Sequence, residues 1–298
     1  MRLALTAITE ELRRLKASGV DSVVVSEEGL AALRQSVARA PRTLPAATPE
    51  PRASPAESPG ATRQAAPRAD AVPAPDAVPI PVVTLPAGSK QARWDALLQL
   101  VTQDPVCRAK LRPGKKVVLG VGNLDASLMF VGEAPGAEEE VQGEPFVGPA
   151  GQLLNRMIAG MALSRAEVYI GNIMNWRPDL PVGPDGIQTG NRPPTEAEMA
   201  HCMPYLKAQI DIVGPGLIVA LGATAAKALL GPKSFGALGE VRGRWHDFGG
   251  RPLMVTYHPS YILRNPTNRT KRMIWEDLLK VMERAKLPVS DKQRGFFL

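Results

Sequence analysis

Three polar side chains of different chemistry lie at the ends of short apolar runs in this sequence. Glu133 directly follows the run 128–132, Asn172 lies near the end of another, and His258 ends a third. A carboxylate and an imidazole can carry acid–base chemistry, and an amide can both donate and accept hydrogen bonds. If the runs are parallel strands, their carboxyl ends meet at the edge where open α/β sheets bind ligands. The three residues therefore predict a chemical site at that edge.

Each of these residues also has a purely structural interpretation. Glu133 could be an acid that complements the dipole of a following helix. Asn172 could satisfy backbone groups of a turn, as asparagine often does. His258, which precedes Pro259, could be a hydrogen-bonded loop histidine. The structural interpretations are less favoured for the three residues together, because all three fall at predicted strand ends.

A parallel sheet covered by helices is needed to bring these residues together. Continuous Val/Ile/Leu runs that alternate with helical segments are typical of strands buried on both faces. We therefore predict a three-layer α/β/α sandwich with a central four-stranded parallel sheet. The predicted strands are 128–132, 168–173, 217–222 and 253–258. The predicted helices are 91–103, 149–161, 194–212, 222–230 and 269–286.

The chain divides into four predicted segments. Residues 1–40 carry apolar side chains at helical spacing and are predicted to form a small helical arm, which could dock a partner or be a vestige. Residues 41–88 are rich in Pro and Ala and are predicted to be a disordered linker, with a Pro-rich docking peptide as the alternative. Residues 89–290 form the predicted folded domain, and 291–298 a C-terminal tail.

The composition limits the class of protein. The formal net charge of +7 suits a polyanionic partner without requiring one. The two cysteines, Cys107 and Cys202, exclude a disulfide scaffold and suit a reducing compartment. No run approaches the roughly 20 apolar residues of a membrane span, and Glu10 and Glu11 interrupt any signal peptide. We expect a cytoplasmic monomer without membrane contact.

Other motifs carry less information. The stretch GVGN at 120–123 lacks the third glycine of a dinucleotide-binding fingerprint, and no zinc site is legible from the scattered histidines and cysteines. The acidic run 138–140 is most simply interpreted as a solvated face at a helix start.

Five stretches carry a resemblance to a known family. They are VGEAPGAEEEVQGEPFVGPAGQLL, VYIGNIMNWRP, NRPPTEAEMAHCMPYL, LIVALGATAAKALLG and TYHPSYILR. In this order they resemble the family 4 uracil-DNA glycosylases, over roughly residues 107–280. The resemblance implies a four-stranded parallel sheet between helices. It also implies an enzyme of base excision repair that hydrolyses the bond between uracil and deoxyribose in DNA.

The resemblance also implies roles for individual residues. Glu133 matches the acid that positions or polarises the attacking water, and His258 matches the imidazole at uracil O2. Asn172 would read the uracil edge, and Phe146 would stack on the base once it is flipped out of the DNA. The remaining matched positions are Ala134, Gly136 and Ser260 for substrate binding, and Arg177 and Arg264 for DNA contact.

The resemblance fails at the iron–sulfur cluster that the family usually holds on four cysteines. Asp104 and Trp176 stand at two of the four positions, so only Cys107 and Cys202 remain. Two thiolates cannot hold a Cys₄ cluster. We therefore expect no cofactor, with Trp176 filling the space that metal and sulfide would occupy.

A second departure is the segment 179–191, which is longer and richer in glycine than the family's connection. It has no histidine, unlike the subgroup that traps its substrate covalently, and its two aspartates argue against a strong phosphate clamp. The favoured function is a monofunctional uracil-DNA glycosylase that leaves an abasic site in uracil-containing DNA. One alternative is a glycosylase for hypoxanthine or xanthine. The other is an inactive DNA-binding repair scaffold that recruits protein partners through its arm and linker, which has no physical need to keep all four site residues.

Overall fold

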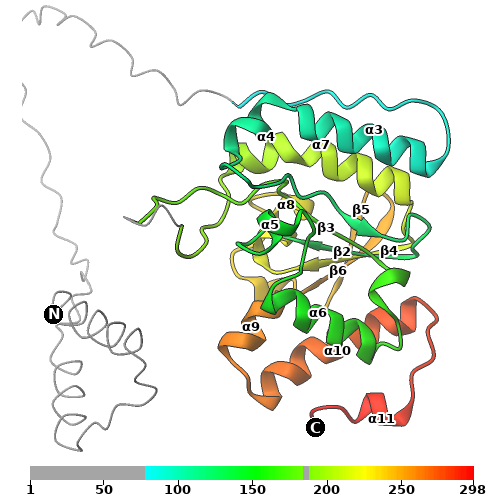
Figure 1. The fold of residues 1–298 in the computed structure, drawn as a ribbon. Helices are drawn as coiled ribbons and strands as arrows, with labels where there is room; N and C mark the ends of the chain where they lie inside the picture. Colours follow the sequence, from blue (N-terminus) through cyan, green and yellow to red (C-terminus); the bar gives the residue numbers. More distant parts are fainter. Residues whose placement is uncertain (1–77, 184–187) are drawn as a thin grey trace, which may run out of the picture. The chain divides into compact units, whose positions relative to one another are not determined.

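The computed structural model describes residues 78–183 and 188–298, which form one folded unit (Figure 1). The predicted helical arm and most of the predicted linker lie outside the described residues. The folded part begins before the predicted boundary at residue 89, because Val83 and Leu85 pack against an apolar cluster of the domain. The predicted tail is also part of the domain, since it contains a short helix and Phe296 lies 5.3 Å from the ring of Trp275.

The described residues form a sheet of six strands in the order β1-β3-β2-β4-β6-β5. The strands are β1 (Val121–Gly122), β2 (Leu128–Gly132), β3 (Tyr169–Asn172), β4 (Leu217–Leu221), β5 (Trp245–Phe248) and β6 (Arg251–Thr256). The inner strands β3, β2, β4 and β6 run parallel, which confirms the predicted parallel sheet. The edge strands β1 and β5 are antiparallel additions. They were not predicted because β1 is two residues long and β5 is only half-buried, so neither forms a continuous apolar run.

Helices cover both faces of the sheet, as the predicted α/β/α architecture requires (Figure 1). They are α3 (Lys90–Gln103), α4 (Pro105–Lys110), α5 (Glu139–Gln142), α6 (Pro149–Gly160), α7 (Glu196–Val213), α8 (Ala223–Leu230), α9 (Pro259–Arg264), α10 (Asn268–Arg284) and α11 (Asp291–Arg294). The five predicted helices correspond to α3, α6, α7, α8 and α10. The others are four to six residues long, which is too short to show a helical period. None of the helices described here is long and apolar enough to cross a bilayer.

The hydrophobic core lies on both faces of the sheet because successive strand side chains point to opposite sides. Phe130 packs in the cluster that contains Leu154 of α6 and Leu278 of α10. Its neighbour Met129 packs in the cluster that contains Leu206 of α7. Every residue of β2, β3 and β4 is buried, so these strands give the sheet a rigid centre.

The register of the parallel strands aligns their carboxyl ends. Gly132 at the end of β2 pairs with Asn172 at the end of β3, and Leu221 at the end of β4 pairs with Thr256 at the end of β6. Residues that follow these strands therefore converge at one edge. His258 lies two residues beyond β6, where it caps α9 instead of ending the strand.

Candidate active site

A cavity of about 720 Å³ opens at the carboxyl edge of the parallel strands. All but one of the site residues expected from the sequence line it: Glu133, Ala134, Gly136, Phe146, Asn172, His258, Ser260 and Arg264. They come from the loops after β2 and β6, from β3 and from α9. Residues more than 120 positions apart in the chain are thus brought to one place by the sheet.

Glu133 follows β2 directly and is half-buried in the cavity wall. Burial raises the pKa of its carboxyl group, and a hydrogen bond from the Thr224 side chain at the start of α8 only partly opposes this rise. The carboxylate is therefore a stronger base than an exposed glutamate. Its place after a strand, rather than inside a helix, argues against the structural interpretation as a helix-dipole acid.

His258 is held in one orientation by the start of α9. Its Nδ1 accepts the backbone N–H of Ser260 at 3.2 Å and lies 2.8 Å from the Ser260 hydroxyl oxygen. Burial and the nearby charge of Arg264 lower the pKa of the imidazole to about 4. The ring is therefore neutral near pH 7, and because Nδ1 accepts a hydrogen bond, the proton resides on Nε2. No described residue takes a hydrogen bond from this Nε2–H group.

Gly132 makes room for two of the expected substrate-binding residues. A Cβ atom at this position would collide with the ring of Phe146 and with Oδ1 of Asn172. The Phe146 ring lies 5.6 Å from the ring of His258, with 30° between their planes. The absence of a side chain at residue 132 therefore lets an aromatic face, an amide and an imidazole share the cavity.

The loop that carries Phe146 is strained and firmly held. Phe146 has a φ of +55°, which is uncommon for a residue other than glycine. The Arg165 guanidinium donates hydrogen bonds to the carbonyl oxygens of Pro145 at 2.5 Å and of Phe146 at 3.2 Å. Such strained conformations persist only where the surroundings impose them, and they concentrate at functional sites.

Glu139 is a further residue of the site that the sequence did not reveal. Its carboxylate accepts the N–H groups of Val147 and Gly148, both at 3.0 Å, and that of Gly136 at 3.1 Å. One carboxylate thus ties the loop after Glu133 to the loop that carries Phe146. The interpretation of residues 138–140 as a solvated face was wrong for two of the three acids, since Glu139 is half-buried and Glu140 is buried. The sequence signal that could have revealed this role is the position of the acidic run between two glycine-containing turns, at Gly136 and Gly148.

Arg177 differs from its expected role at the DNA surface. The side chain is buried and donates to Glu140 at 2.9 Å, to Asn191 at 2.8 Å and to the carbonyl oxygen of Gly190 at 2.8 Å. It does not line the cavity. The guanidinium is fully engaged inside the protein, so we assign Arg177 to holding the 179–191 segment rather than to DNA contact.

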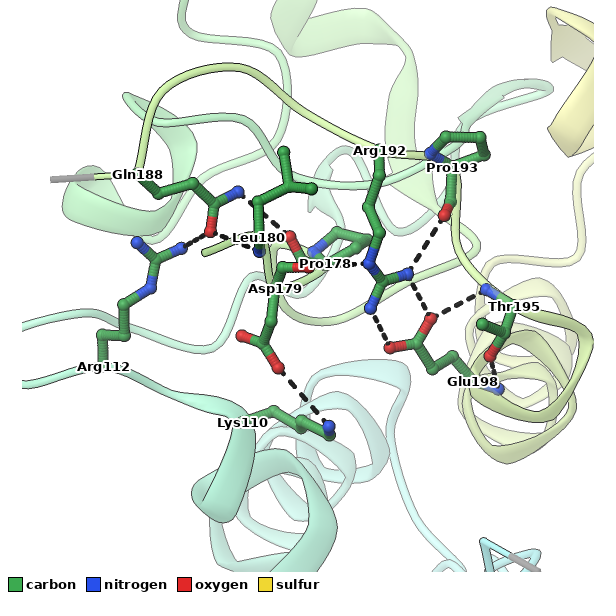
Figure 2. Close-up of polar contacts among 10 residues, drawn as sticks. All are labelled: Lys110, Arg112, Pro178, Asp179, Leu180, Gln188, Arg192, Pro193, Thr195 and Glu198. Carbon is green, nitrogen blue, oxygen red and sulfur yellow. Dashed lines mark hydrogen bonds and ion pairs between the residues drawn. The ribbon is translucent and has the colours of Figure 1, made fainter. Parts of the chain in front are cut away.

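Residues at or next to both ends of the 179–191 segment line the cavity. Figure 2 shows the polar contacts that hold these ends. Gln188 accepts the N–H of Leu180 at 3.0 Å and donates to the carbonyl oxygen of Pro178 at 3.1 Å, so it joins the two ends of the segment. Arg192 donates to the carbonyl oxygen of Asp179 at 2.7 Å and to both carboxylate oxygens of Glu198 at 2.7 and 2.8 Å. These contacts place Arg192 and Pro193 in the cavity wall.

Asp179 and Glu198 both form ion pairs within the fold. Asp179 forms an ion pair with Lys110 at 3.4 Å (Figure 2). Glu198 also accepts the backbone N–H of Thr195 at 2.7 Å, which completes a capping box at the start of α7. The T-x-x-E spacing at residues 195–198 was the one sequence signal that could have located this anchor.

Comparisons with known proteins identify the family. The model of the uracil DNA glycosylase superfamily matches residues 119–279. The chain belongs to this superfamily. It is 44% identical over 165 residues to the type-4 uracil-DNA glycosylase of Thermotoga maritima, which covers 55% of this chain and 80% of that protein. It is 39% identical over 176 residues to the type-4 enzyme of Saccharolobus solfataricus, covering 57% and 76%.

A type-5 uracil-DNA glycosylase of Pyrobaculum aerophilum is more distant, with 30% identity over 181 residues, or 55% of this chain and 73% of that protein. The resemblance to family 4 that the sequence motifs indicated is therefore confirmed. The glycosylase superfamily fold is also consistent with the α/β/α sandwich described above.

The four positions at which family 4 glycosylases hold their cluster lie in one buried region of this chain. Cys107, Trp176 and Cys202 belong to one apolar cluster, and all three side chains are fully buried. Burial raises the pKa of both thiols, so both stay protonated. Asp104 caps α4, and its pKa is lowered because hydrogen bonds from Cys107 and Tyr205 outweigh the effect of burial. Two neutral thiols, an indole and a carboxylate do not fit a [4Fe–4S] cluster.

Proposed function

We propose that this chain is a uracil-DNA glycosylase that hydrolyses the bond between uracil and deoxyribose in DNA and leaves an abasic site. The observation that carries the proposal is the convergence of Glu133, Phe146, Asn172 and His258 on one cavity in a superfamily fold. A base inside a duplex is out of reach, so it must first be flipped into this cavity at a cost of a few kcal/mol. Stacking on Phe146 would offset roughly 1–3 kcal/mol of that cost.

Recognition of uracil would fall to Asn172, which is buried beside the Phe146 ring. Its amide can donate to the O4 oxygen of uracil and accept from its N3–H group. Cytosine presents an amino group and a bare nitrogen at the same places, so its donors and acceptors are mismatched. The buried amide of Asn172 would therefore discriminate strongly against cytosine, because its hydrogen-bonding groups would remain unpaired.

Bond cleavage places negative charge on the departing uracil and positive charge on the sugar. The neutral His258 can donate its Nε2–H to uracil O2, where part of the negative charge collects. The Ser260 N–H fixes the ring before the reaction begins. Donors oriented in advance toward developing charge usually make the largest contribution to catalysis.

Glu133 would complete the hydrolysis. The carbon–nitrogen bond breaks with its electron pair on uracil, and the oxygen of a water molecule bonds to the sugar carbon. Glu133 orients this water and takes up its proton, and its carboxylate also faces the positive charge on the sugar. The raised pKa of Glu133 suits this task, because a general base works best when its pKa approaches the working pH.

We further propose that the enzyme works without an iron–sulfur cluster, as a monomer in the cytoplasm. The lack of two of the four cysteine ligands supports the first part. The two free, buried thiols suit a reducing compartment. The arm and linker remain candidates for contact with a protein partner, and Arg264 for contact with the DNA backbone.

The experiment that tests the function is alkaline cleavage of a labelled oligonucleotide with one uracil, single-stranded and duplexed. The wild type should produce strand breaks, and His258→Ala and Asn172→Ala should lose them while they still bind DNA. His246→Ala is the matched control, because His246 lies on β5 and bonds the carbonyl oxygen of Val241. Tight binding without breaks by the wild type would support the scaffold instead. Breaks only with hypoxanthine or xanthine would change the substrate.

A further inference from the structure

We infer that a metal-free hydrogen-bonded core, centred on Asp104, takes the place of the family's iron–sulfur cluster and fixes one wall of the substrate cavity. This Asp104 core comprises Asp104, Trp176, His201 and Tyr205. The effect of this core on the cavity wall rests on the proposed function.

Both oxygens of the Asp104 carboxylate have hydrogen-bond partners in the protein. Oδ1 accepts the N–H of Cys107 at 2.7 Å and lies 3.1 Å from Nε2 of His201. Oδ2 accepts the hydroxyl of Tyr205 at 2.8 Å. The residue that replaces a cysteine thus joins α4 to two successive turns of α7, which is the type of link that a shared cluster would otherwise provide.

His201 has no ring nitrogen left for a metal ion. Its side chain is 1% exposed, and its Nδ1 lies 2.5 Å from the carbonyl oxygen of Pro79, while Nε2 faces Asp104. Both ring nitrogens therefore lie at hydrogen-bond distance from an oxygen atom of the protein. The side chains of Asp104, Cys107 and His201 are close enough together to suggest a cation site. Their hydrogen bonds argue against it, because a ligating histidine needs one free lone pair.

Trp176 occupies the middle of this region. Its side chain is fully buried, and its ring lies 5.8 Å from that of His201 and in the same apolar cluster as both cysteines. Its Nε1–H has no hydrogen-bond partner among the described residues. An indole N–H can donate but cannot bind a metal. The large ring therefore fills the space of a cluster but cannot act as a metal ligand.

The Asp104 core is connected to the cavity through the segment 172–177. This segment starts at Asn172 in the cavity, passes through Trp176 and ends at Arg177, which holds Glu140 and Gly190. Fixing Trp176 between α4 and α7 therefore fixes both the residue expected to read uracil and the anchor of the cavity wall at Pro178 and residues 191–193.

The first test measures bound metal in the purified full-length protein by mass spectrometry, after growth with iron and zinc supplied. We expect iron and zinc well below one per chain, and no change in the melting temperature with a chelator. Iron or zinc at one or more per chain, lost on chelation together with stability, would overturn the inference. Neither the metal content nor the melting temperature depends on catalytic activity.

The second test is a double-mutant cycle on thermal unfolding. Asp104→Ala should lower the melting temperature by about 10 °C, because it leaves buried donors unpaired. Tyr205→Phe should lower it less, and should add little when Asp104 is already Ala. Asp125→Ala is the matched control, since that carboxylate is 79% exposed. Additive effects of the two substitutions on the melting temperature would refute a shared core. If Asp104→Ala fails to fold, an unchanged melting temperature of Tyr205→Phe alone would refute it.

The third test addresses the cavity wall by hydrogen exchange of backbone amides. In Tyr205→Phe and in Trp176→Phe, the amides of residues 188–192 should exchange several-fold faster than in the wild type. The amides of α10, which packs on the other face of the sheet, should not change. Unchanged exchange at 188–192 would refute the link to the wall. If the link holds, the KM for uracil-containing DNA should rise more than kcat falls.

Discussion

At the scale of single residues, burial and one hydrogen bond decide the chemistry of each group. His258 is neutral because it is buried near Arg264, and its tautomer is set by the Ser260 N–H. Burial raises the pKa of Glu133 and makes it a stronger base, and the hydrogen bond from Thr224 only partly opposes this rise. Glu139 also lines the cavity, but its carboxylate holds two loops at their backbone. Side chains of the same type, Glu133 and Glu139, thus take different roles because of what surrounds them.

The lowered pKa of His258 predicts a specific dependence of stability on pH. Between the folded pKa of about 4 and the usual value of 6.5, the unfolded chain binds a proton that the folded chain does not. The free energy of unfolding should therefore rise with pH across this window, by up to about 3 kcal/mol from this residue. Denaturant titrations at several pH values should show the rise in the wild type and a smaller one in His258→Asn. An equal rise in both would refute the lowered pKa.

Glu139→Gln should impair the enzyme without unfolding it. The amide keeps one acceptor oxygen but loses the charge that accepts three N–H groups, so the Phe146 loop should move from its working position. We expect kcat/KM for uracil excision to fall by about 10- to 100-fold, as small misplacements often cause. Glu138→Gln, which changes an exposed neighbour, should behave as the wild type. Equal losses in both variants would contradict a positioning role.

At the scale of elements, the ends of the parallel strands bring the site together. The β2–β3 register pairs Gly132 with Asn172, so two residues 40 positions apart become neighbours. Short helices then fix the orientation of individual side chains, as α9 does for His258, which is its N-cap residue. The small size of residue 132 is part of this arrangement, because Phe146 and Asn172 both press against it.

Gly132→Ala should separate folding from function. The new methyl group would displace the Phe146 ring and the Asn172 amide, since both occupy its place. We expect loss of excision by at least about 100-fold, with a circular dichroism spectrum close to that of the wild type. Gly216→Ala is the control, because its methyl group would meet only the Ser127 carbonyl oxygen at an ordinary distance of 3.5 Å. Full activity in Gly132→Ala would contradict the cavity geometry.

At the scale of the whole molecule, three apolar clusters of the described residues support the site. Two of them lie on the faces of the sheet and one lies beneath α3 and α7. The segment before α3 belongs to the third cluster through Val83 and Leu85, and the Pro79 carbonyl oxygen reaches His201. The residues that end the chain pack on Trp275 of α10.

Truncation should reveal where the working domain begins. A chain that starts at residue 78 keeps every residue that lines the cavity, so it should excise uracil from short oligonucleotides as the full chain does. A chain that starts at residue 89 loses Val83, Leu85 and the Pro79 acceptor, and its melting temperature should fall by about 5–10 °C. Equal melting temperatures of the two truncated chains would show that residues 78–88 add nothing to stability.

The sequence alone determined the architecture and the residues of the proposed chemistry. Continuous apolar runs such as 128–132 predict parallel strands, because strands buried on both faces must be apolar throughout. Glu133, Asn172 and His258 could then be placed at one edge, since parallel strands end on the same side. The missing cysteines were equally legible, because a cluster requires ligands of a fixed kind.

The tertiary structure alone decided what the charged side chains do. The burial of Arg177 and the Asp104 core join segments far apart in the chain, and no local pattern encodes such pairings. A charge in a sequence looks the same whether it meets water, DNA or a buried partner. Only packing fixes that partner, because the free energy of a charge depends on the distance to its neighbours and on how much water is excluded around it.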